Sequence, residues 1–169
     1  QVICVDKDKN KIDKLNSGIS PIYEPGLDEL IKKNYSAKRL FFTSNIKNAI
    51  NLSDIIFICV GTPTKKGSIK VDLSYVYKCT KEILKNSKRK KIIVTKSTVP
   101  IGTGDEIEKL LAKKKKLFNV VSNPEFLREG EAIRDFRYPD RIVIGSNEKK
   151  NFNICLINTS DAAEEDDSV

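Results

Sequence analysis

The sequence predicts an α/β fold with a doubly wound, mostly parallel sheet, and three observations lead to this prediction. Short apolar runs rich in β-branched residues alternate with amphipathic segments along the chain, as in parallel strands joined by right-handed helical crossovers. The apolar runs are continuous rather than alternating, which is expected of strands buried on both faces. Polar residues follow four of these runs, at the position where open sheets of this kind bind ligands.

The first half of the chain begins with the apolar run Val2–Val5, which is predicted to be a buried strand. Asp8–Ser17 is predicted to be a helix. A second helix is expected to begin at Pro25, because the missing N–H of proline costs nothing at a first helical position. The apolar stripes of these helices are Ile12 with Leu15 and Leu27 with Leu30 and Ile31, and they are followed by a strand at Leu40–Thr43 and a short helix marked by Ile46, Ala49 and Ile50.

The second half continues the alternation of strand and helix. Asp72 is placed to cap one helix, and Thr103 with Glu106 fits a capping box at the start of another. Both helices carry apolar residues at helical spacing on one face. The strands predicted in this half are Ile55–Val60, Ile92–Thr95, Leu117–Val121 and Ile142–Ile144.

Composition restricts the class of protein. The chain has 169 residues, 39% hydrophobic and 32% charged, which is enough for a compact domain with its own core. It contains no histidine, which excludes His-dependent catalytic triads and His-ligated metal sites, and no metal site is predicted. No apolar run approaches the ~18–20 residues of a membrane span, so no membrane association is expected.

Charge and cysteine usage predict a cytoplasmic protein that does not bind nucleic acid. The net charge is +8, but the lysines are scattered and lack interleaved aromatic residues, which indicates a solvated surface. Nucleic-acid binding is the alternative that this charge leaves open. The cysteines form no C-x-x-C pair and are expected to be reduced and mostly buried; they are Cys4, Cys59, Cys79 and Cys155.

Polar residues directly follow four predicted strands, at Asp6, Gly61–Thr64, Ser97–Pro100 and Asn123–Glu125. The carboxyl ends of parallel strands meet at one edge of a sheet, near which ligands bind. One such loop is explained by ordinary turn chemistry, and this is the alternative for each of them. Four loops together predict a single composite site.

Two of these residues are carboxylates with a defined chemistry. An acid at the end of the second strand of a dinucleotide-binding domain accepts hydrogen bonds from the adenosine ribose hydroxyls, and Asp6 fits this position; capping the next helix is the alternative. The glycine fingerprint should lie about 20 residues before such an acid, whereas only five residues precede Asp6. Glu125, between Pro124 and Phe126, is suited to general acid–base work, and the alternative is an exposed loop glutamate.

Four sequence blocks, each modest alone, form a specific pattern through their order and spacing. They are Asn16-x-Gly18-x-x-Pro21-Ile22-Tyr23-Glu24-Pro25-Gly26-Leu27, then Val60-Gly61-Thr62-Pro63, then Lys96-Ser97-Thr98-Val99-Pro100, and then Ser122-Asn123-Pro124-Glu125-Phe126-Leu127-Arg128-Glu129-Gly130 with Pro139-Asp140-Arg141-Ile142-Val143-Ile144-Gly145. With these blocks the chain resembles the N-terminal, NAD-binding domain of the UDP-glucose/GDP-mannose dehydrogenases, which implies a Rossmann-like sheet.

The resemblance implies a four-electron oxidation, in which a sugar 6-hydroxyl becomes a carboxylate through two hydride transfers to NAD. Asp6 matches the acid that binds the adenosine ribose, and Lys11 matches the basic residue beside the adenosine. Glu125 matches a glutamate assigned to acid–base work in thioester hydrolysis, and Thr98 a threonine that positions the reacting groups and water. The other cofactor residues implied are Val60, Gly61, Thr62, Pro63, Thr64, Ser97, Val99 and Glu129, and the segment implied to bind the sugar nucleotide is Glu125, Phe126, Leu127, Arg128 and Glu129.

The resemblance also ranks the substrates. The blocks Tyr23–Gly26 and Pro139–Arg141 favour UDP-glucose, oxidised to UDP-glucuronate, as the partner of the parent enzyme. GDP-mannose and UDP-N-acetyl-mannosamine dehydrogenases are the alternatives within the family. A non-catalytic nucleotide-binding module or a decayed remnant is the alternative outside it.

Several parts of the family pattern are missing from the sequence: the first strand with its G-x-G-x-x-G loop, the linking helix, and the second domain with its nucleophilic cysteine. Cys155 lies in an apolar run that does not match that cysteine. Residues 1–147 are expected to form an incomplete NAD-binding domain, and residues 148–169 a divergent, disordered acidic tail. The chain is therefore expected to be a truncated fragment of a homo-oligomeric enzyme, inactive alone.

Overall fold

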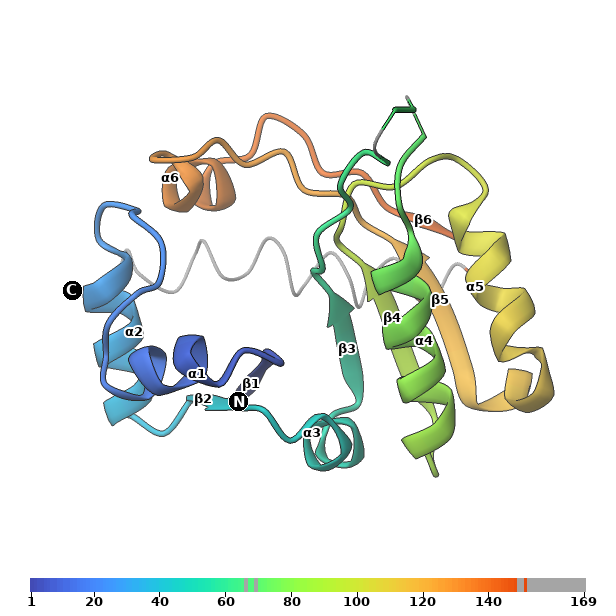
Figure 1. The fold of residues 1–169 in the computed structure, drawn as a ribbon, viewed down its shortest axis with the longest axis horizontal. Helices are drawn as coiled ribbons and strands as arrows, with labels where there is room; N and C mark the ends of the chain where they lie inside the picture. The colour runs from blue at the N-terminus through green and yellow to red at the C-terminus, as the bar shows by residue number, and fades with distance from the viewer. Residues whose placement is uncertain (66, 69, 149–150, 152–169) are drawn as a thin grey trace. The chain divides into compact units, whose positions relative to one another are not determined.

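The computed structural model describes residues 1–65, 67–68, 70–148 and 151. The chain divides into two compact units, and each contains parallel strands and helices (Figure 1). Unit 1 comprises residues 1–52 and 126–140, and unit 2 comprises residues 53–125 and 141–169. The predicted α/β class is thereby confirmed.

Unit 1 is built on a two-stranded parallel sheet of β1 (Val2–Val5) and β2 (Leu40–Thr43), paired from Val2 with Leu40 to Val5 with Thr43. Helices α1 and α2 connect the two strands and both contact β2. Apolar side chains from three helices are buried in this unit, among them Ile12, Ile31 and Ile50. The helices of unit 1 are α1 (Lys9–Asn16), α2 (Leu27–Ser36), α3 (Ile46–Leu52) and α6 (Ala132–Arg137).

The first two helices begin later than predicted, for different reasons. The Asp8 side chain accepts hydrogen bonds from the amides of Asn10 and Lys11, so it is the N-cap of α1 rather than its first residue. The prediction that α2 begins at Pro25 is wrong. Gly26 has a φ of +80°, in the left-handed region, and is the N-cap of a helix that starts at Leu27. This backbone conformation favours glycine and cannot continue a right-handed helix.

The prediction that Val2–Val5 is buried is also wrong, since Val2 is 58% exposed and Val5 40% exposed. The reason lies in the topology: β1 has one strand neighbour, β2, and forms an edge of the sheet of unit 1. A continuous apolar run is buried on both faces only where neighbouring elements cover them.

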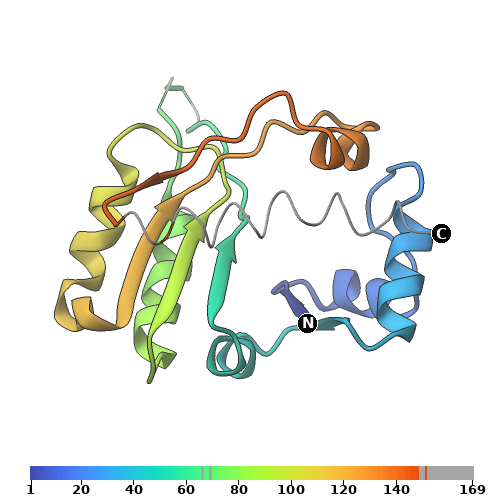
Figure 2. The ribbon, with the colours of Figure 1, turned by 180° about the vertical axis from the view of Figure 1, so that it is seen from behind.

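Unit 2 contains a four-stranded sheet in the order β3-β4-β5-β6, parallel except for the last strand. Helices α4 and α5 contact each other and lie on one face of the sheet, as Figures 1 and 2 show from opposite sides. The elements are β3 (Ile55–Ile58), α4 (Ser74–Asn86), β4 (Lys91–Thr95), α5 (Thr103–Leu111), the 3₁₀ helix η1 (Ala112–Leu117), β5 (Phe118–Ser122) and β6 (Gly145–Ser146).

The central strands of unit 2 are buried as predicted. Ile93, Val94 and Val121 have no exposed surface, and Ile144 packs against Val94 and Val121. Strand β4 has a strand on each side, which explains why its continuous apolar run is buried. The core of unit 2 therefore fixes the carboxyl ends of β4 and β5.

Three sequence-based details of unit 2 need correction. Strand β3 ends at Ile58 rather than Val60: its last pair with β4 is Ile58 with Thr95, and beyond it the Val60 carbonyl accepts from the Ser97 hydroxyl. The last strand is Gly145–Ser146, antiparallel to β5, rather than Ile142–Ile144. Thr103 and Glu106 form no capping box: Gly102 is the N-cap, the Thr103 hydroxyl donates to the Pro100 carbonyl, and Glu106 accepts from the Tyr77 hydroxyl.

Two further predictions concern single residues. Asp72 was predicted to cap α4, but the N-cap is Leu73, which makes no side-chain capping hydrogen bond; Asp72 lies one residue earlier and accepts from the Ser74 amide at 2.9 Å. The cysteines were expected to be mostly buried, and this is wrong for those the structure describes. Cys4 and Cys59 are exposed and Cys79 is half-buried, and none of these three forms a disulfide. Cys4 lies on the edge strand β1, and Cys59 follows the last residue of β3. Cys155 lies outside the described residues.

Candidate functional site

Two loops that follow adjacent strands of unit 2 are joined at the carboxyl edge of the sheet. The Ser97 hydroxyl, 8% exposed, donates to the carbonyls of Val60 at 2.7 Å and Ile58 at 3.2 Å. The Thr62 hydroxyl donates to the Thr98 carbonyl at 2.9 Å. The predicted cofactor residues of the two loops are therefore brought together; they are Val60, Gly61, Thr62, Pro63, Thr64, Ser97, Thr98 and Val99.

The third loop, after β5, lies against the second. The Asn123 amide donates to the Thr95 carbonyl at 3.0 Å, and the Glu125 amide donates to the Lys96 carbonyl at 3.4 Å. Glu125 is half-buried, whereas Thr98 is exposed. Three of the four polar strand ends predicted to share one edge thus do so. We call these three loops, at 60–64, 96–99 and 123–125, the rim.

Asn123 belongs to a strand end predicted from the sequence, but its contacts and the part of Lys96 in them were not predicted. The Asn123 side chain is 1% exposed; its oxygen accepts from Lys96 Nζ at 3.0 Å and its amide donates to the Val143 carbonyl at 2.9 Å. One buried amide thus links the ends of β4 and β5 to the segment before β6. The sequence does contain an indication of this contact: an asparagine and a lysine each directly follow a buried strand, and a buried polar side chain needs a hydrogen-bond partner.

Asp6 and Lys11 form a pair in unit 1. Asp6 directly follows β1, and its carboxylate accepts from the Asp8 amide at 3.0 Å and from Lys11 Nζ at 3.0 Å. These contacts, first the backbone amide and then the lysine, lower the pKa of Asp6. Asp8, not Asp6, caps α1, so the helix-capping alternative for Asp6 is wrong. An ionised carboxylate with acceptor positions at a strand end suits a ribose diol.

The predicted sugar-nucleotide segment spans the boundary between the units, with Glu125 in unit 2 and Phe126 onward in unit 1. Phe126 is 47% exposed and Leu127 39% exposed, and Glu129 is exposed as well. The side chains of this predicted segment are therefore accessible from the surface.

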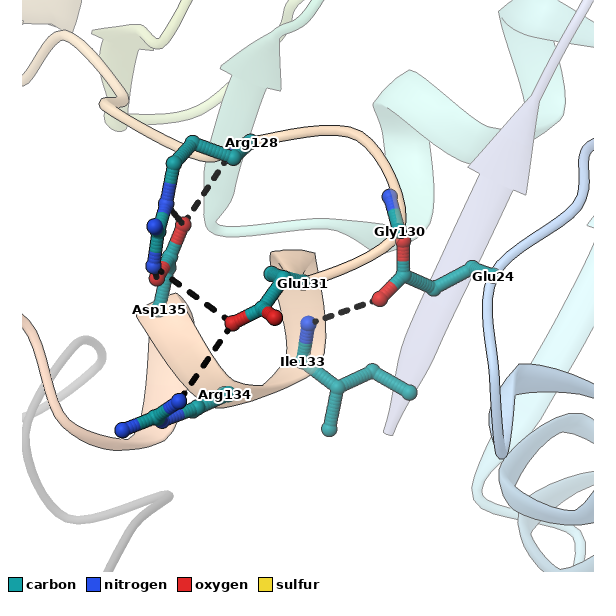
Figure 3. A network of polar contacts seen from close by, with 7 residues as sticks. All are labelled: Glu24, Arg128, Gly130, Glu131, Ile133, Arg134 and Asp135. Carbon is teal, nitrogen blue, oxygen red and sulfur yellow. Dashed lines mark hydrogen bonds and ion pairs between the residues drawn. The ribbon is translucent and has the colours of Figure 1, made fainter.

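Arg128 is engaged within the chain. Its Nη2 and Nε donate to the Asp135 carboxylate at 2.6 and 3.0 Å, and its backbone amide donates to the same group at 3.0 Å (Figure 3). Hydrogen bonds from Arg128 lower the pKa of Asp135 to about 2, and the same pair raises the pKa of Arg128. Arg128 thus stabilises the loop in which it lies.

Within residues 1–65, 67–68, 70–148 and 151, no group of three or more histidine, cysteine or acidic side chains is arranged to hold a metal ion. None of the helices in these residues has both the length and the hydropathy to cross a membrane.

Comparison with known proteins adds the family. The model of the UDP-glucose/GDP-mannose dehydrogenase family, NAD binding domain, matches residues 1–157. The UDP-glucose 6-dehydrogenase of Rhizobium meliloti is 53% identical over 146 residues, which are 85% of this chain and 33% of the relative. TuaD, a UDP-glucose 6-dehydrogenase of Bacillus subtilis, is 49% identical over 153 residues, 89% of this chain and 33% of the relative. The chain spans about a third of the length of these curated relatives.

Solved structures show the same relationship. A UDP-glucose dehydrogenase from Pyrobaculum islandicum is 37% identical with a TM-score of 0.85, covering 92% of this chain and 37% of that one. A GDP-mannose dehydrogenase from Pseudomonas aeruginosa, solved as a ternary complex, is 38% identical with a TM-score of 0.86, covering 95% of this chain and 39% of that one. Both are dehydrogenases with the fold class predicted from the sequence.

Proposed function

Because this chain belongs to the UDP-glucose/GDP-mannose dehydrogenase family, whose domain of this type uses NAD, we propose that it forms part of the NAD-binding half of a UDP-glucose 6-dehydrogenase. The observation that supports the proposal is the rim. The loops at 60–64 and 96–99 are joined by the contacts of Thr62 with Thr98 and of Ser97 with Val60, and the loop at 123–125 lies against the second through the hydrogen bond from the Glu125 amide to the Lys96 carbonyl. The whole enzyme would oxidise UDP-glucose to UDP-glucuronate, and NAD would accept the two hydrides.

The residues present fit NAD in part. Asp6, ionised and paired with Lys11, would accept hydrogen bonds from the adenosine ribose and repel a 2′-phosphate. The rim would hold the remainder with backbone groups of Val60–Thr64 and Ser97–Val99. The printed sequence has no G-x-G-x-x-G loop, so the pyrophosphate lacks its usual helix N-terminus among these residues.

The chain's own residues have distinct proposed roles in the reaction. Glu125, held at the end of β5 through its backbone amide, would take a proton from the attacking water in the hydrolytic step. Thr98, exposed at the end of β4, would position that water. Phe126, Leu127 and Glu129 would contact the sugar nucleotide and the nicotinamide.

Titration of the isotope-labelled 169-residue chain tests this proposal by NMR. NAD should shift the amides of Asp6, Thr62 and Ser97, and NADP should do so more weakly because of Asp6. Asp6→Asn should reduce this preference, and Asp28→Asn, the same change on α2, is the matched control. Equal responses to NAD and NADP in the unmodified chain would count against the assignment of Asp6.

The substrate is tested by the same method. UDP-glucose should shift the amides of Glu125–Glu129 more strongly than GDP-mannose does at equal concentration. The curated relatives named UDP-glucose 6-dehydrogenase, 46–53% identical, favour this order. A stronger response to GDP-mannose would support that second candidate.

The remaining features are proposals about the whole enzyme. We place it in the cytoplasm as a homo-oligomer that binds neither nucleic acid nor membranes. Residues 1–147 would be its NAD-binding portion, while the acidic tail proposed for 148–169 falls almost entirely outside the described residues. The 169-residue chain alone should form no NADH from UDP-glucose, because the proposed reaction needs an activated nucleophile that no residue in the matched blocks supplies.

A further inference from the structure

The Glu24 side chain hydrogen-bonds segment 126–140 to the N-terminal part of unit 1. Its Oε2 accepts from the Gly130 amide at 2.9 Å and its Oε1 accepts from the Ile133 amide at 3.3 Å (Figure 3). The two contacts join residues separated by 106 and 109 positions in the sequence. Glu24 is half-buried, so these hydrogen bonds are partly shielded from competing water.

The backbone on both sides is shaped for this contact. Gly26 has a φ of +80° and Gly130 a φ of +83°, values that favour glycine. A Cβ built on Gly26 would lie 3.8 Å from Ile133 Cδ1, so the turn that carries Glu24 also packs against α6. A carboxylate suits this position, because each of its two oxygens accepts from one of the N–H donors, on Gly130 and Ile133.

Segment 126–140 is also stabilised by hydrogen bonds and ion pairs between its own residues. Asp135 accepts from the backbone amide and the guanidinium of Arg128, and Glu131 lies 3.5 Å from both Arg128 and Arg134. The stretch between Arg128 and Ile133 is therefore fixed at both ends, by Asp135 and by Glu24 (Figure 3). Charge-assisted hydrogen bonds thus stabilise this loop. The two residues that precede it, Phe126 and Leu127, are exposed.

We propose that Glu24 is a positioning residue for segment Phe126–Glu129, and this inference rests on the proposed function of that segment in binding the sugar nucleotide. Glu24 acts through the amides of Gly130 and Ile133 and does not itself touch the substrate. By fixing the backbone at Gly130, it fixes the direction in which Leu127 and Glu129 present their side chains.

Amide hydrogen exchange of the 169-residue chain tests the contact itself. In Glu24→Ala, the amides of Gly130 and Ile133 should exchange at least about tenfold faster, the effect of losing a hydrogen bond to a charged group. Glu24→Gln keeps one carbonyl acceptor and should give an intermediate rate. Glu29→Ala, which removes an exposed glutamate from the first turn of α2, is the matched control and should leave both amides unchanged.

The positioning role needs a second measurement that general destabilisation would not reproduce. Amides of β4 and β5 in unit 2 should exchange as in the unmodified chain, while UDP-glucose should shift the Phe126–Glu129 amides less in Glu24→Ala than in Glu29→Ala. Unchanged exchange at Gly130 and Ile133 would overturn the contact. Faster exchange with an undiminished response to UDP-glucose would overturn the positioning role.

A third outcome separates this inference from the proposed function. If UDP-glucose shifts no amide of segment 126–129 even in the unmodified chain, the proposed substrate segment is wrong. The backbone order of that segment, measured by ¹⁵N relaxation without ligand, then tests the effect of Glu24. If the segment is less ordered in Glu24→Ala than in Glu29→Ala, the proposal is supported. If the order is equal in both variants, the proposal is contradicted.

Discussion

The rim of unit 2 and segment 126–140 of unit 1 hold their residues by different physical means. Ser97 and Asn123, at 8% and 1% exposure, bind backbone carbonyls inside a packed parallel sheet. Segment 126–140 instead depends on carboxylates: Asp135 with Arg128, and Glu24 with two amides. The contacts of Ser97 with Val60 and of Asn123 with Val143 join neutral groups, which respond little to pH and salt, whereas exposed ion pairs such as Arg128–Asp135 respond to both. The rim should therefore be rigid and the segment adjustable.

The largest effect is expected at Asn123, because its side chain joins Lys96 to Val143. Asn123→Ala removes from a buried site the side chain that bonds both Lys96 and Val143. It should lower the free energy of unfolding of unit 2 by about 2–4 kcal/mol. Asn123→Asp keeps the acceptor for Lys96 and should cost less. Urea unfolding, followed at the amides of β4 and β5, measures this loss of stability. An Asn123→Ala variant as stable as the unmodified chain would contradict the role of Asn123 in holding the rim together.

The next largest effect on stability should differ among three neighbouring hydroxyl groups at the end of β4, because only one of them is both buried and hydrogen-bonded within the described residues. Ser97→Ala leaves the Val60 carbonyl without its hydroxyl donor and should cost about 1–2 kcal/mol. Thr98→Ala, at an exposed position, should change the stability by less than about 0.5 kcal/mol. The Thr95 hydroxyl is buried and has no hydrogen-bond partner among the described residues, so Thr95→Val should be neutral or stabilising. Chemical denaturation ranks the three, and a destabilisation by Thr95→Val equal to that of Ser97→Ala would contradict this explanation.

Acid should loosen segment 126–140 before it affects the rim. Pairing with Arg128 lowers the pKa of Asp135 to about 2 from an ordinary value of about 3.9. A lowered pKa means that the carboxylate stabilises the folded segment above pH 4, and that this stabilisation is lost as the pH falls towards 2. Exchange at the Arg128 amide, corrected for intrinsic rates, should become less protected over this range.

Two comparisons make the acid result specific. In Asp135→Asn, protection of the Arg128 amide should be low at neutral pH and should no longer depend on acid. Amides of β4, which face no such carboxylate pair, should keep their protection down to the pH at which the whole chain unfolds. Simultaneous loss in both regions would show that they are not held independently.

The smallest effect is expected in alkali, at the contact between α4 and α5. The Tyr77 hydroxyl donates to Glu106, which raises the pKa of Tyr77 to about 12. A raised pKa means that the neutral phenol stabilises unit 2 below about pH 10, and that this contribution is lost as the pH rises towards 12. Ultraviolet titration should show one late tyrosine that is absent in Tyr77→Phe, with Tyr75→Phe as the control. No late component in the unmodified chain would contradict the assignment.

The sequence was most informative where a strand is buried by strands on both sides. Ile93, Val94 and Val121 lie in the core as their continuous apolar runs predicted. The same pattern failed at Val2 and Val5, because burial at an edge strand depends on elements that a local pattern does not describe. Pro25 and the Thr103–Glu106 pair failed because glycines at 26 and 102, both with positive φ, set the helix starts instead.

The candidate site, too, could be predicted from the sequence only in part. The rim loops could be predicted because parallel strands bring their carboxyl ends together. The Asn123–Lys96 contact and the Glu24 contacts could not, since they join residues 27 and more than 100 positions apart. Such pairings depend on the tertiary fold, and each of these residues alone is compatible with an exposed loop.

The most direct measurement is a titration of the labelled chain with UDP-glucose and NAD together, observed at every assigned amide. The proposed function predicts saturable shifts at Gly61, Thr62, Thr98 and Glu125, reduced by Thr62→Ala and unaffected by Lys113→Ala on the lysine-rich surface. Shifts confined to exposed lysines, such as those at 113–116, and abolished by moderate salt, would instead show nonspecific anion binding and contradict the assignment of the rim as a nucleotide site.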